Sequence, residues 1–540
     1  MLHKRLLARK SLEHLMAEMA GENRLRRALG PISLTALGVG CIIGAGIFVM
    51  TGRAAAEDAG PAVMISYSIA ALGCVFAALC YAEFAAMAPV AGSAYTYAYA
   101  TLGELFAWII GWDLILEYAM ACACVASAWG NYLNEFLLIV FKVTLPAHLC
   151  SDPFSTPGAW FNAPAVAIML VITAILIVGI RESALTNAIL TLVKLIVVLF
   201  VIGMGFTLVN QTQNNWTDVP YTMRLGTADQ ERNETEESEK WGLLGQLIDP
   251  ATLKPIDDAV RSNFAPYGLS GIMLGAAIVF FAFIGFDSIS THSEEAIHPQ
   301  RDVPIAILSS LGLCTVLYVL VAAVITGMEP YPQIDTKAAI AAAFRKQAEL
   351  TGSGVLKASS VLIATGALAG LTSVLLVTFL SQARIFLAMA RDKLLPPSIF
   401  GAIHPRFKTP HISTALTGLV ICLTAAFTPI SDLEKMVNIG TLFAFTIVCI
   451  TVLILRIQRP QLERPFRCPW LYAVAPLGVL VNLAMMMFLP LSTWLRLLVW
   501  MALGLVFYFA YGYHHSVLGK ELVRELSQEG IGPTDAPLRT

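Results

Sequence analysis

Charged side chains are scarce in this sequence. Asp, Glu, Lys and Arg together make up only 13% of its 540 residues, whereas an ordinary soluble domain carries about a quarter. Hydrophobic residues reach 57%, and the mean hydropathy is +0.71. These values exclude an ordinary soluble domain and indicate a chain that lies mostly in lipid.

Patterns of cysteine and histidine that would build a disulfide framework or a metal site are also missing. Most of the ten cysteines lie in apolar segments, and only Cys150 falls in a predicted outer loop. Cys122 and Cys124 fit neither a redox pair nor a zinc knuckle, so we interpret them as packing residues. His292 and His298 form no ligand pair on one helix face. We therefore expect no metal, no cofactor and no enzyme.

The first thirty residues lack the apolar core and the small-residue cleavage site of a secretory signal peptide. They are basic and amphipathic, with apolar residues that can share one helical face: Leu6, Leu7, Leu12, Leu15, Met16 and Met19. We expect residues 1–30 to form a cytoplasmic segment on the inner membrane surface. The first apolar span then acts as the insertion signal.

Apolar stretches of about twenty residues, the length that crosses a bilayer as a helix, recur along almost the whole chain. We predict twelve spans, at approximately 33–54, 62–88, 104–136, 161–180, 185–209, 268–292, 304–327, 356–386, 411–428, 435–456, 470–489 and 494–513. The predicted fold class is therefore an all-α polytopic membrane protein.

Basic residues indicate the orientation of these spans. Lys and Arg gather in the N-terminal segment and in the loops at 384–408 and 456–467. The opposite side is poorer in them, although residues 328–356 carry three. Because basic loops stay in the cytoplasm, we expect both termini to be cytoplasmic and the protein to lie in the cell (inner or plasma) membrane.

One long polar stretch interrupts the apolar pattern. Residues 210–266 include the acidic run at 231–237 and should project from the outer face. This loop either recruits a partner or is a tolerated insertion, and we favour tolerance because surface loops accept insertions readily.

Glycines interrupt two spans that lie five spans apart. Span 1 contains Gly44-Ala45-Gly46, and span 6 contains Gly285 after a phenylalanine-rich run. Glycines such as Gly40 and Gly44 can also serve close helix packing. Interruptions at corresponding places in two halves, however, point to a transporter with an inverted repeat and a binding site at the midplane. We favour that interpretation.

An unwound helix exposes amides and carbonyls that hydrocarbon cannot satisfy, so the break persists only where it lines a cavity or ligand. Amides around Gly44–Gly46 would face a carboxylate, with the positive end of the helix dipole behind them. Free carbonyls near Ile42, Phe281, Ala282 and Ile284 would accept hydrogen bonds from an ammonium group. The simplest molecule with both groups is an α-amino acid.

Three ionisable residues lie inside predicted spans, where charge is costly and usually functional. Lys194 in span 5 is the most isolated cation, and we favour a switchable charge that couples transport over a permanently paired structural lysine. For Glu117 in span 3, contact with substrate or proton and plain structural pairing are nearly even. Asp287 fits a helix-end or gating carboxylate better than a ligand.

An ordered set of motifs between residues 11 and 515 resembles the amino acid-polyamine-organocation (APC) superfamily, and within it the bacterial members of the cationic amino acid transporter family. The motifs are the basic N-terminal helix, 40–48, 111–118, Lys194, 280–287, 294–304 and 388–396. The resemblance implies a five-plus-five inverted repeat with discontinuous helices 1 and 6. It divides the chain into a transport core at 31–457, two accessory helices at 458–515 and a cytoplasmic tail at 516–540.

The resemblance also assigns substrate residues in spans 1 and 6: Ile42, Ala45, Gly46, Phe281, Ala282 and Ile284. Phe281 takes the place of an aromatic lid, and Glu117 and Ala121 should face the same cavity. Lys194 matches the lysine of proton-coupled relatives, which stands in for the sodium ion of sodium-coupled ones. Many relatives have Ser or Thr at the position of Ala45. This chain lacks that hydroxyl, so backbone amides must supply more of the hydrogen bonds to the substrate carboxylate.

Together these features predict a secondary active transporter for L-amino acids, coupled to protons. Cationic substrates (arginine, lysine or ornithine) are favoured over small neutral ones. The alternative is a membrane sensor that binds an amino acid without moving it. The expected partners are the L-amino acid, the proton and the lipid bilayer, with no nucleic acid.

Overall fold

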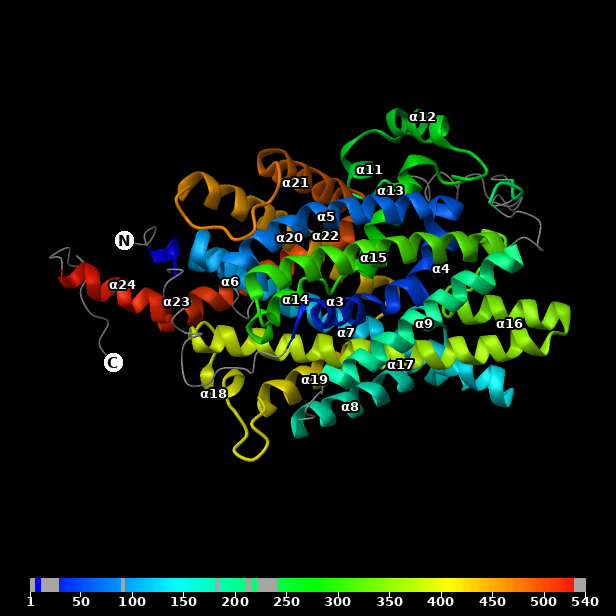
Figure 1. Cartoon of the computed structure of the whole chain (residues 1–540), viewed down its shortest axis with the longest axis horizontal. Coiled ribbons are helices and arrows are strands. Elements are labelled where there is room, and N and C mark those ends of the chain that lie inside the picture. Colours follow the sequence, from blue (N-terminus) through cyan, green and yellow to red (C-terminus); the bar gives the residue numbers. More distant parts are fainter. Residues whose placement is uncertain are drawn as a thin grey trace.

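The computed structural model describes residues 5–10, 29–88, 93–179, 184–209, 216–220 and 240–528, and in these ranges the regular elements are helices. The long helices run side by side along the longest axis of the molecule (Figure 1). Both termini lie at one end together with α24, and α16 lies at the opposite end (Figure 1). We call these the terminal end and the far end.

Within the described ranges, twelve apolar helical segments make up the body of the molecule. Eight are long and apolar enough to cross a membrane: Gly46–Met87, Glu104–Phe141, Ile189–Val209, Gly268–Thr291, Pro299–Met328, Gly354–Arg391, Ile430–Gln458 and Leu491–His515. Four are shorter: Pro31–Ile42, Ala163–Val178, His411–Phe427 and Leu471–Met487. The prediction of an all-helical, multi-span protein is confirmed.

The individual elements have the following bounds. The first half contains α3 (Pro31–Ile42), η1 (Gly46–Met50), α4 (Thr51–Arg53), η2 (Ala54–Ala59), η3 (Gly60–Ala62), α5 (Val63–Met87), α6 (Ser93–Thr101), α7 (Glu104–Phe141), α8 (Ala163–Val178) and α9 (Ala184–Val209). The second half contains α11 (Leu244–Leu247), α12 (Pro250–Val260), α13 (Gly268–Val279), η6 (Phe280–Phe283), α14 (Ser288–Thr291), α15 (Pro299–Met328), α16 (Ala339–Thr351), α17 (Gly354–Arg391), α18 (Pro397–Phe400), α19 (His411–Phe427), α20 (Ile430–Gln458), α21 (Leu471–Met487), α22 (Leu491–Phe507), α23 (Tyr513–His515) and α24 (Val517–Gln528).

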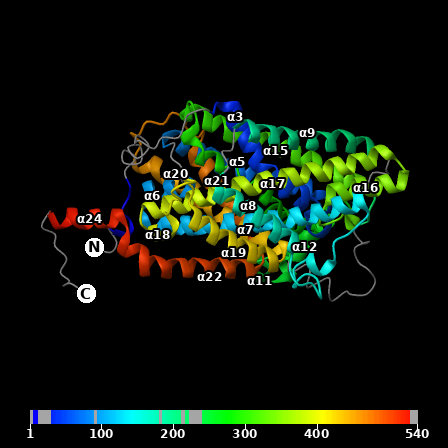
Figure 2. The same cartoon turned by 90° about the horizontal axis from the view of Figure 1, so that it is seen from below.

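The share of buried residues differs strongly between helices and shows which helices lie in the interior of the bundle. In the most apolar window of Glu104–Phe141, which is α7, 83% of the residues are buried inside the protein, against 33% for Ile189–Val209 and 22% for Leu491–His515. Figure 2 shows α9 and α22 at opposite edges of the molecule. The polar residues of α7 therefore face other helices, whereas α9 and α22 present wide apolar faces to lipid.

Two sequence-based boundaries differ from the structure. The segment between predicted spans 1 and 2 is helical: the π-helix η2 ends just before Gly60, which has a φ of +63°, and the 3-10 helix η3 continues through Pro61. Part of the polar loop forms the surface helices α11 and α12. Its acidic run, most of the amphipathic N-terminal segment and the end of the tail lie outside the described residues.

Candidate functional site

The helix of span 1 is interrupted inside the bundle. Helix α3 ends at Ile42, and Ile43 is extended, with a φ of −73° and a ψ of 100°. Helical structure resumes at Ala45 and continues as the π-helix η1. The break therefore begins one residue before the predicted Gly44-Ala45-Gly46.

Span 6 is interrupted in the same manner. After α13 the chain tightens into the 3-10 helix η6, and Ile284 is extended, with a φ of −59° and a ψ of 135°. Gly285 has a φ of +116°, a conformation that only glycine adopts without strain, and a Cβ there would lie 3.1 Å from the backbone of Cys41. Helix α14 follows. The second predicted interruption is present too.

The two interruptions touch each other. A Cβ at Gly46 would overlap the backbone of Ala282, so η1 and η6 meet with no side chain between them. The predicted residues of span 1 thereby lie beside those of span 6, and all of them except the partly exposed Ile284 are buried. Gly40 has a different use, since a Cβ there would overlap Thr191 of α9. At Gly40, close helix packing is the correct interpretation.

Two tyrosines bind the carbonyls freed by the breaks. The hydroxyl of Tyr318, on α15, lies 2.7 Å from the Ile42 carbonyl oxygen and 2.9 Å from that of Ala282. The hydroxyl of Tyr67, on α5, lies 3.1 Å from the Gly46 carbonyl oxygen. The sequence analysis missed both. The available signal was a tyrosine in an apolar span, since a buried hydroxyl needs a partner.

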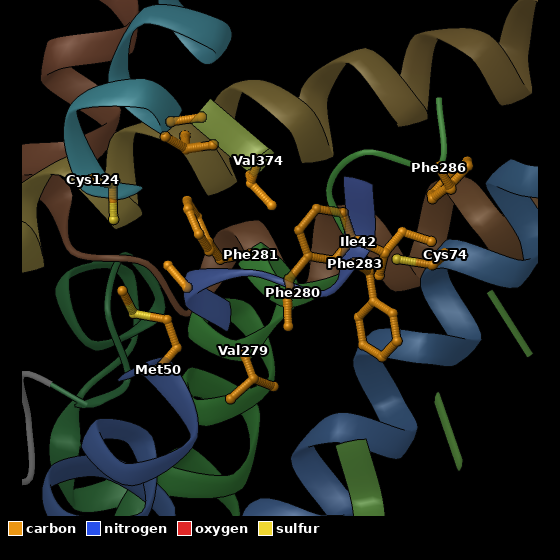
Figure 3. Close-up of a cluster of buried hydrophobic side chains, with 14 of the residues drawn as sticks. Ile42, Met50, Cys74, Cys124, Val279, Phe280, Phe281, Phe283, Phe286 and Val374 are labelled. Atoms are coloured by element: carbon orange, nitrogen blue, oxygen red, sulfur yellow. The ribbon is translucent and has the colours of Figure 1, made fainter. Parts of the chain in front are cut away.

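Phe281 differs from the other phenylalanines of this region. Phe283 packs on Tyr67 and Tyr318, and Phe286 packs on Tyr81. Among the described residues no ring contact is made by Phe281. Figure 3 shows it on the side of the cluster that carries Cys124 and Met50, whereas Phe283 and Phe286 lie on the side of Cys74. The Phe281 side chain is therefore not held by ring stacking.

Helix α7 brings Glu117 and Ala121 to the interior, where they are 1% and 4% exposed. Within the described part of the chain no group donates a hydrogen bond to either carboxyl oxygen of Glu117. The Thr441 side chain is a neighbour of this carboxyl group, but its hydroxyl donates its hydrogen bond to the Val437 carbonyl oxygen at 3.0 Å. The interpretation of Glu117 as a structurally paired carboxylate therefore finds no hydrogen-bond partner in the described residues.

Asp287, in contrast, is fully engaged in structure. The Tyr118 hydroxyl donates to its Oδ2 at 2.8 Å, and the Gly285 amide donates to its Oδ1 at 3.2 Å. These bonds join α7 to the turn between η6 and α14. Asp287 lies at the start of α14, as expected for a helix-end carboxylate, and its gating role stays a prediction.

Lys194 reaches from α9 to the last turn of α3. Its Nζ donates to the Gly40 carbonyl oxygen at 2.6 Å, and the residue is 1% exposed. Across the described ranges no carboxylate forms an ion pair with it. The negative end of the α3 dipole is thus what offsets its charge.

Ion pairs lie near the interruptions at both ends of the bundle. At the far end, Arg53 Nη1 lies 2.6 Å from Glu434 Oε1 of α20. At the terminal end, Arg384 Nη2 of α17 lies 3.4 Å from Glu295 Oε1. Sequence reasoning named neither pair as part of the site.

Comparisons with known proteins agree with this architecture. The family model for amino acid permeases matches residues 29–508. The methylthioribose transporter of Bacillus subtilis (strain 168) is 39% identical over 95% of this chain and 99% of its own length. The branched-chain amino acid permease BcaP of the same organism is 39% identical over 95% of this chain and 98% of its own length.

Eukaryotic relatives match over a smaller share of their length. The Homo sapiens cationic amino acid transporter 4 is 35% identical over 81% of this chain, and the match spans 61% of that longer protein. Family and relatives alike are membrane transporters and not enzymes. The chain belongs to the amino acid permease family of the APC superfamily.

Proposed function

We propose that this permease is a secondary active transporter that moves an L-amino acid together with a proton. The observation that carries the proposal is the contact of η1 with η6, where Gly46 lies on the backbone of Ala282. Amides at the start of η1 are suited to a carboxylate, and carbonyls of both interruptions to an ammonium group. We further propose twelve spans, with spans 1–10 related as a five-plus-five inverted repeat.

The proposed energy source is a proton that binds and leaves Lys194. The charged ammonium donates to the Gly40 carbonyl in the last turn before the break. A neutral amine would hold this carbonyl less strongly, because charged donors form the stronger hydrogen bonds. Protonation would thus bias the position of α3 against α9, and no sodium ion is required.

Two substrate classes remain candidates within this site. A cationic side chain is favoured by Glu117, whose buried carboxyl has no donor in the described structure. A neutral branched side chain is supported by the apolar residues Met50, Cys124 and Val374 near Phe281 (Figure 3) and by the branched-chain relative. We favour the cationic class, and competition decides between the two.

The test is uptake of labelled arginine, alanine and leucine into proteoliposomes under a pH gradient, each competed by the others. Accumulation of arginine, blocked by lysine or ornithine, is the expected result. Accumulation of leucine or alanine alone would replace the cationic class by the neutral one. Specific binding without any uptake would favour an amino-acid sensor and overturn the transport proposal.

Replacing Gly46 tests the location of the site. Gly46→Leu should abolish substrate binding, because even a Cβ overlaps Ala282. The matched control is Gly203→Leu on α9, where a Cβ meets nothing within 4 Å. Equal affinity of both variants for the substrate would count against a site at η1 and η6.

Replacing Lys194 tests the coupling. Lys194→Ala should keep substrate binding and exchange but lose accumulation driven by a pH gradient. The control is Lys357→Ala, an exposed lysine of α17. If Lys194→Ala concentrates substrate as well as its control does, the switchable lysine is wrong.

We place the transporter in the cell membrane with the terminal end in the cytoplasm. The support is the bias of Lys and Arg toward the loops of this end. Protease cleavage of the tail in intact cells, but not in inside-out vesicles, would reverse the orientation.

A further inference from the structure

Helix α7 carries a second carboxyl group, Asp113, four residues before Glu117. Asp113 is 0% exposed, and in the described structure neither of its oxygens accepts a hydrogen bond. Residues four apart lie on one face of a helix, with about 5–6 Å between their Cβ atoms. Because burying an ionised carboxylate without a partner costs several kcal/mol, this face needs a bound cation or protons.

The helices around Asp113 supply space but no compensating charge. On α20, Gly440 faces the carboxyl, and a Cβ there would lie 3.0 Å from Asp113 Oδ1. On α17, the amide nitrogen of Gln382 donates elsewhere, to the Ile115 carbonyl at 3.1 Å. The charged groups that act on Glu117 are both acidic: Asp287 and Asp113 itself. The described surroundings contain no ion-pair partner for either carboxyl.

Asp113 lies closer than Glu117 to the start of α7. The helix begins at the terminal end, where the Glu104 amide donates to the Ala8 carbonyl at 3.0 Å. With a rise of 1.5 Å per residue, Asp113 lies about 14 Å and Glu117 about 20 Å along the helix from Glu104. Asp113 is therefore between Glu117 and the terminal end.

We propose that Asp113 is a second proton-binding residue besides Lys194, which binds a proton inside the bundle and releases it toward the terminal end. This inference rests on the proposed proton-coupled transport. A hydronium ion gives up a proton, which forms an O–H bond on the Asp113 carboxylate and leaves water behind. That bond then breaks to water at the terminal end, with no change in oxidation state.

The experiment compares Asp113→Asn with Asp432→Asn, a carboxyl of α20 whose ion pair with Arg496 is a third exposed. Both proteins are placed in liposomes with a trapped pH dye, and labelled substrate exchange is measured beside proton movement. Asp113→Asn should exchange substrate at the wild-type rate, while its pH-driven uptake and proton flux fall by roughly tenfold or more. Asp432→Asn should match the wild type in both measurements.

Each outcome separates this inference from the proposal on which it rests. A wild type without pH-driven uptake overturns proton coupling altogether. If the wild type and Asp113→Asn both couple uptake to the pH gradient equally well, only the role of Asp113 is overturned. Uptake that follows a sodium gradient and is lost in Asp113→Asn assigns the carboxyl to a metal cation and overturns the proton.

A second variant covers the case in which Asp113→Asn does not fold. Gly440→Ala keeps the carboxyl but adds a methyl group 3.0 Å from its oxygen. We expect a shifted pH profile of uptake with unchanged exchange. An unchanged pH profile in this variant contradicts a proton at Asp113.

Discussion

Two ion pairs near the interruptions, Arg53–Glu434 and Arg384–Glu295, differ strongly in burial. At the far end the Arg53 and Glu434 side chains are 10% and 0% exposed, whereas at the terminal end those of Arg384 and Glu295 are 28% and 26% exposed. Breaking a buried pair leaves a charge without solvent and costs about 3–5 kcal/mol. Breaking an exposed pair costs about 0–1 kcal/mol.

Neighbouring contacts increase this difference. Arg53 also binds Glu57 at 3.0 Å, and Gly52 lies so close to Ala339 of α16 that a Cβ would overlap it. The terminal end adds the Tyr118–Asp287 bond at 2.8 Å. The comparison teaches that the Arg53–Glu434 pair contributes more to stability than the Arg384–Glu295 pair.

The largest effect is expected from breaking the buried pair. Glu434→Gln removes the buried carboxylate partner of Arg53, which keeps only the half-exposed Glu57, and should lower the free energy of unfolding by about 3–5 kcal/mol. Thermal unfolding in detergent, followed by tryptophan fluorescence, measures it. The control Glu57→Gln removes a half-exposed carboxylate and should cost about 0–1 kcal/mol. Equal losses in both variants would contradict the comparison.

An intermediate effect is expected from Tyr118→Phe. The variant removes the donor to Asp287 and should cost about 1–3 kcal/mol, because a buried acceptor loses its partner. It should also speed maleimide labelling of the buried Cys41 from the terminal side. Tyr132→Phe is the matched control, since this hydroxyl binds the Phe48 carbonyl nearer the far end of α7. Labelling that rises in both variants would mean general loosening.

The smallest effect on stability is expected from Arg384→Ala. Its pair with Glu295 is partly hydrated, so the free energy of unfolding should change by about 0–1 kcal/mol. Cys41 labelling from the terminal side should still rise. A stability loss as large as that of Glu434→Gln would show that the two pairs contribute equally to stability.

Hydropathy and glycine spacing are local signals, so the sequence was sufficient to predict an all-helical, multi-span protein and both interruptions, whereas the count of twelve spans stays a prediction. The sequence also named Glu117 and Lys194, since charge inside an apolar span stands out. It did not identify Tyr318 or the Arg53–Glu434 pair, because the Ile42 carbonyl lies 276 residues from Tyr318 and Glu434 lies far along the chain from Arg53. The helical link between spans 1 and 2 was missed because charged residues there resemble a loop.

The Tyr318 hydroxyl has a single hydrogen for two carbonyl oxygens, at 2.7 and 2.9 Å. At any instant one of the two interrupted helices is therefore short of a donor. An incoming ammonium group carries three N–H bonds and can complete both. If the proposed amino acid binds here, the hydrogen bond that its ammonium group adds contributes about 0.5–1.5 kcal/mol, which a ligand without an N–H donor does not supply.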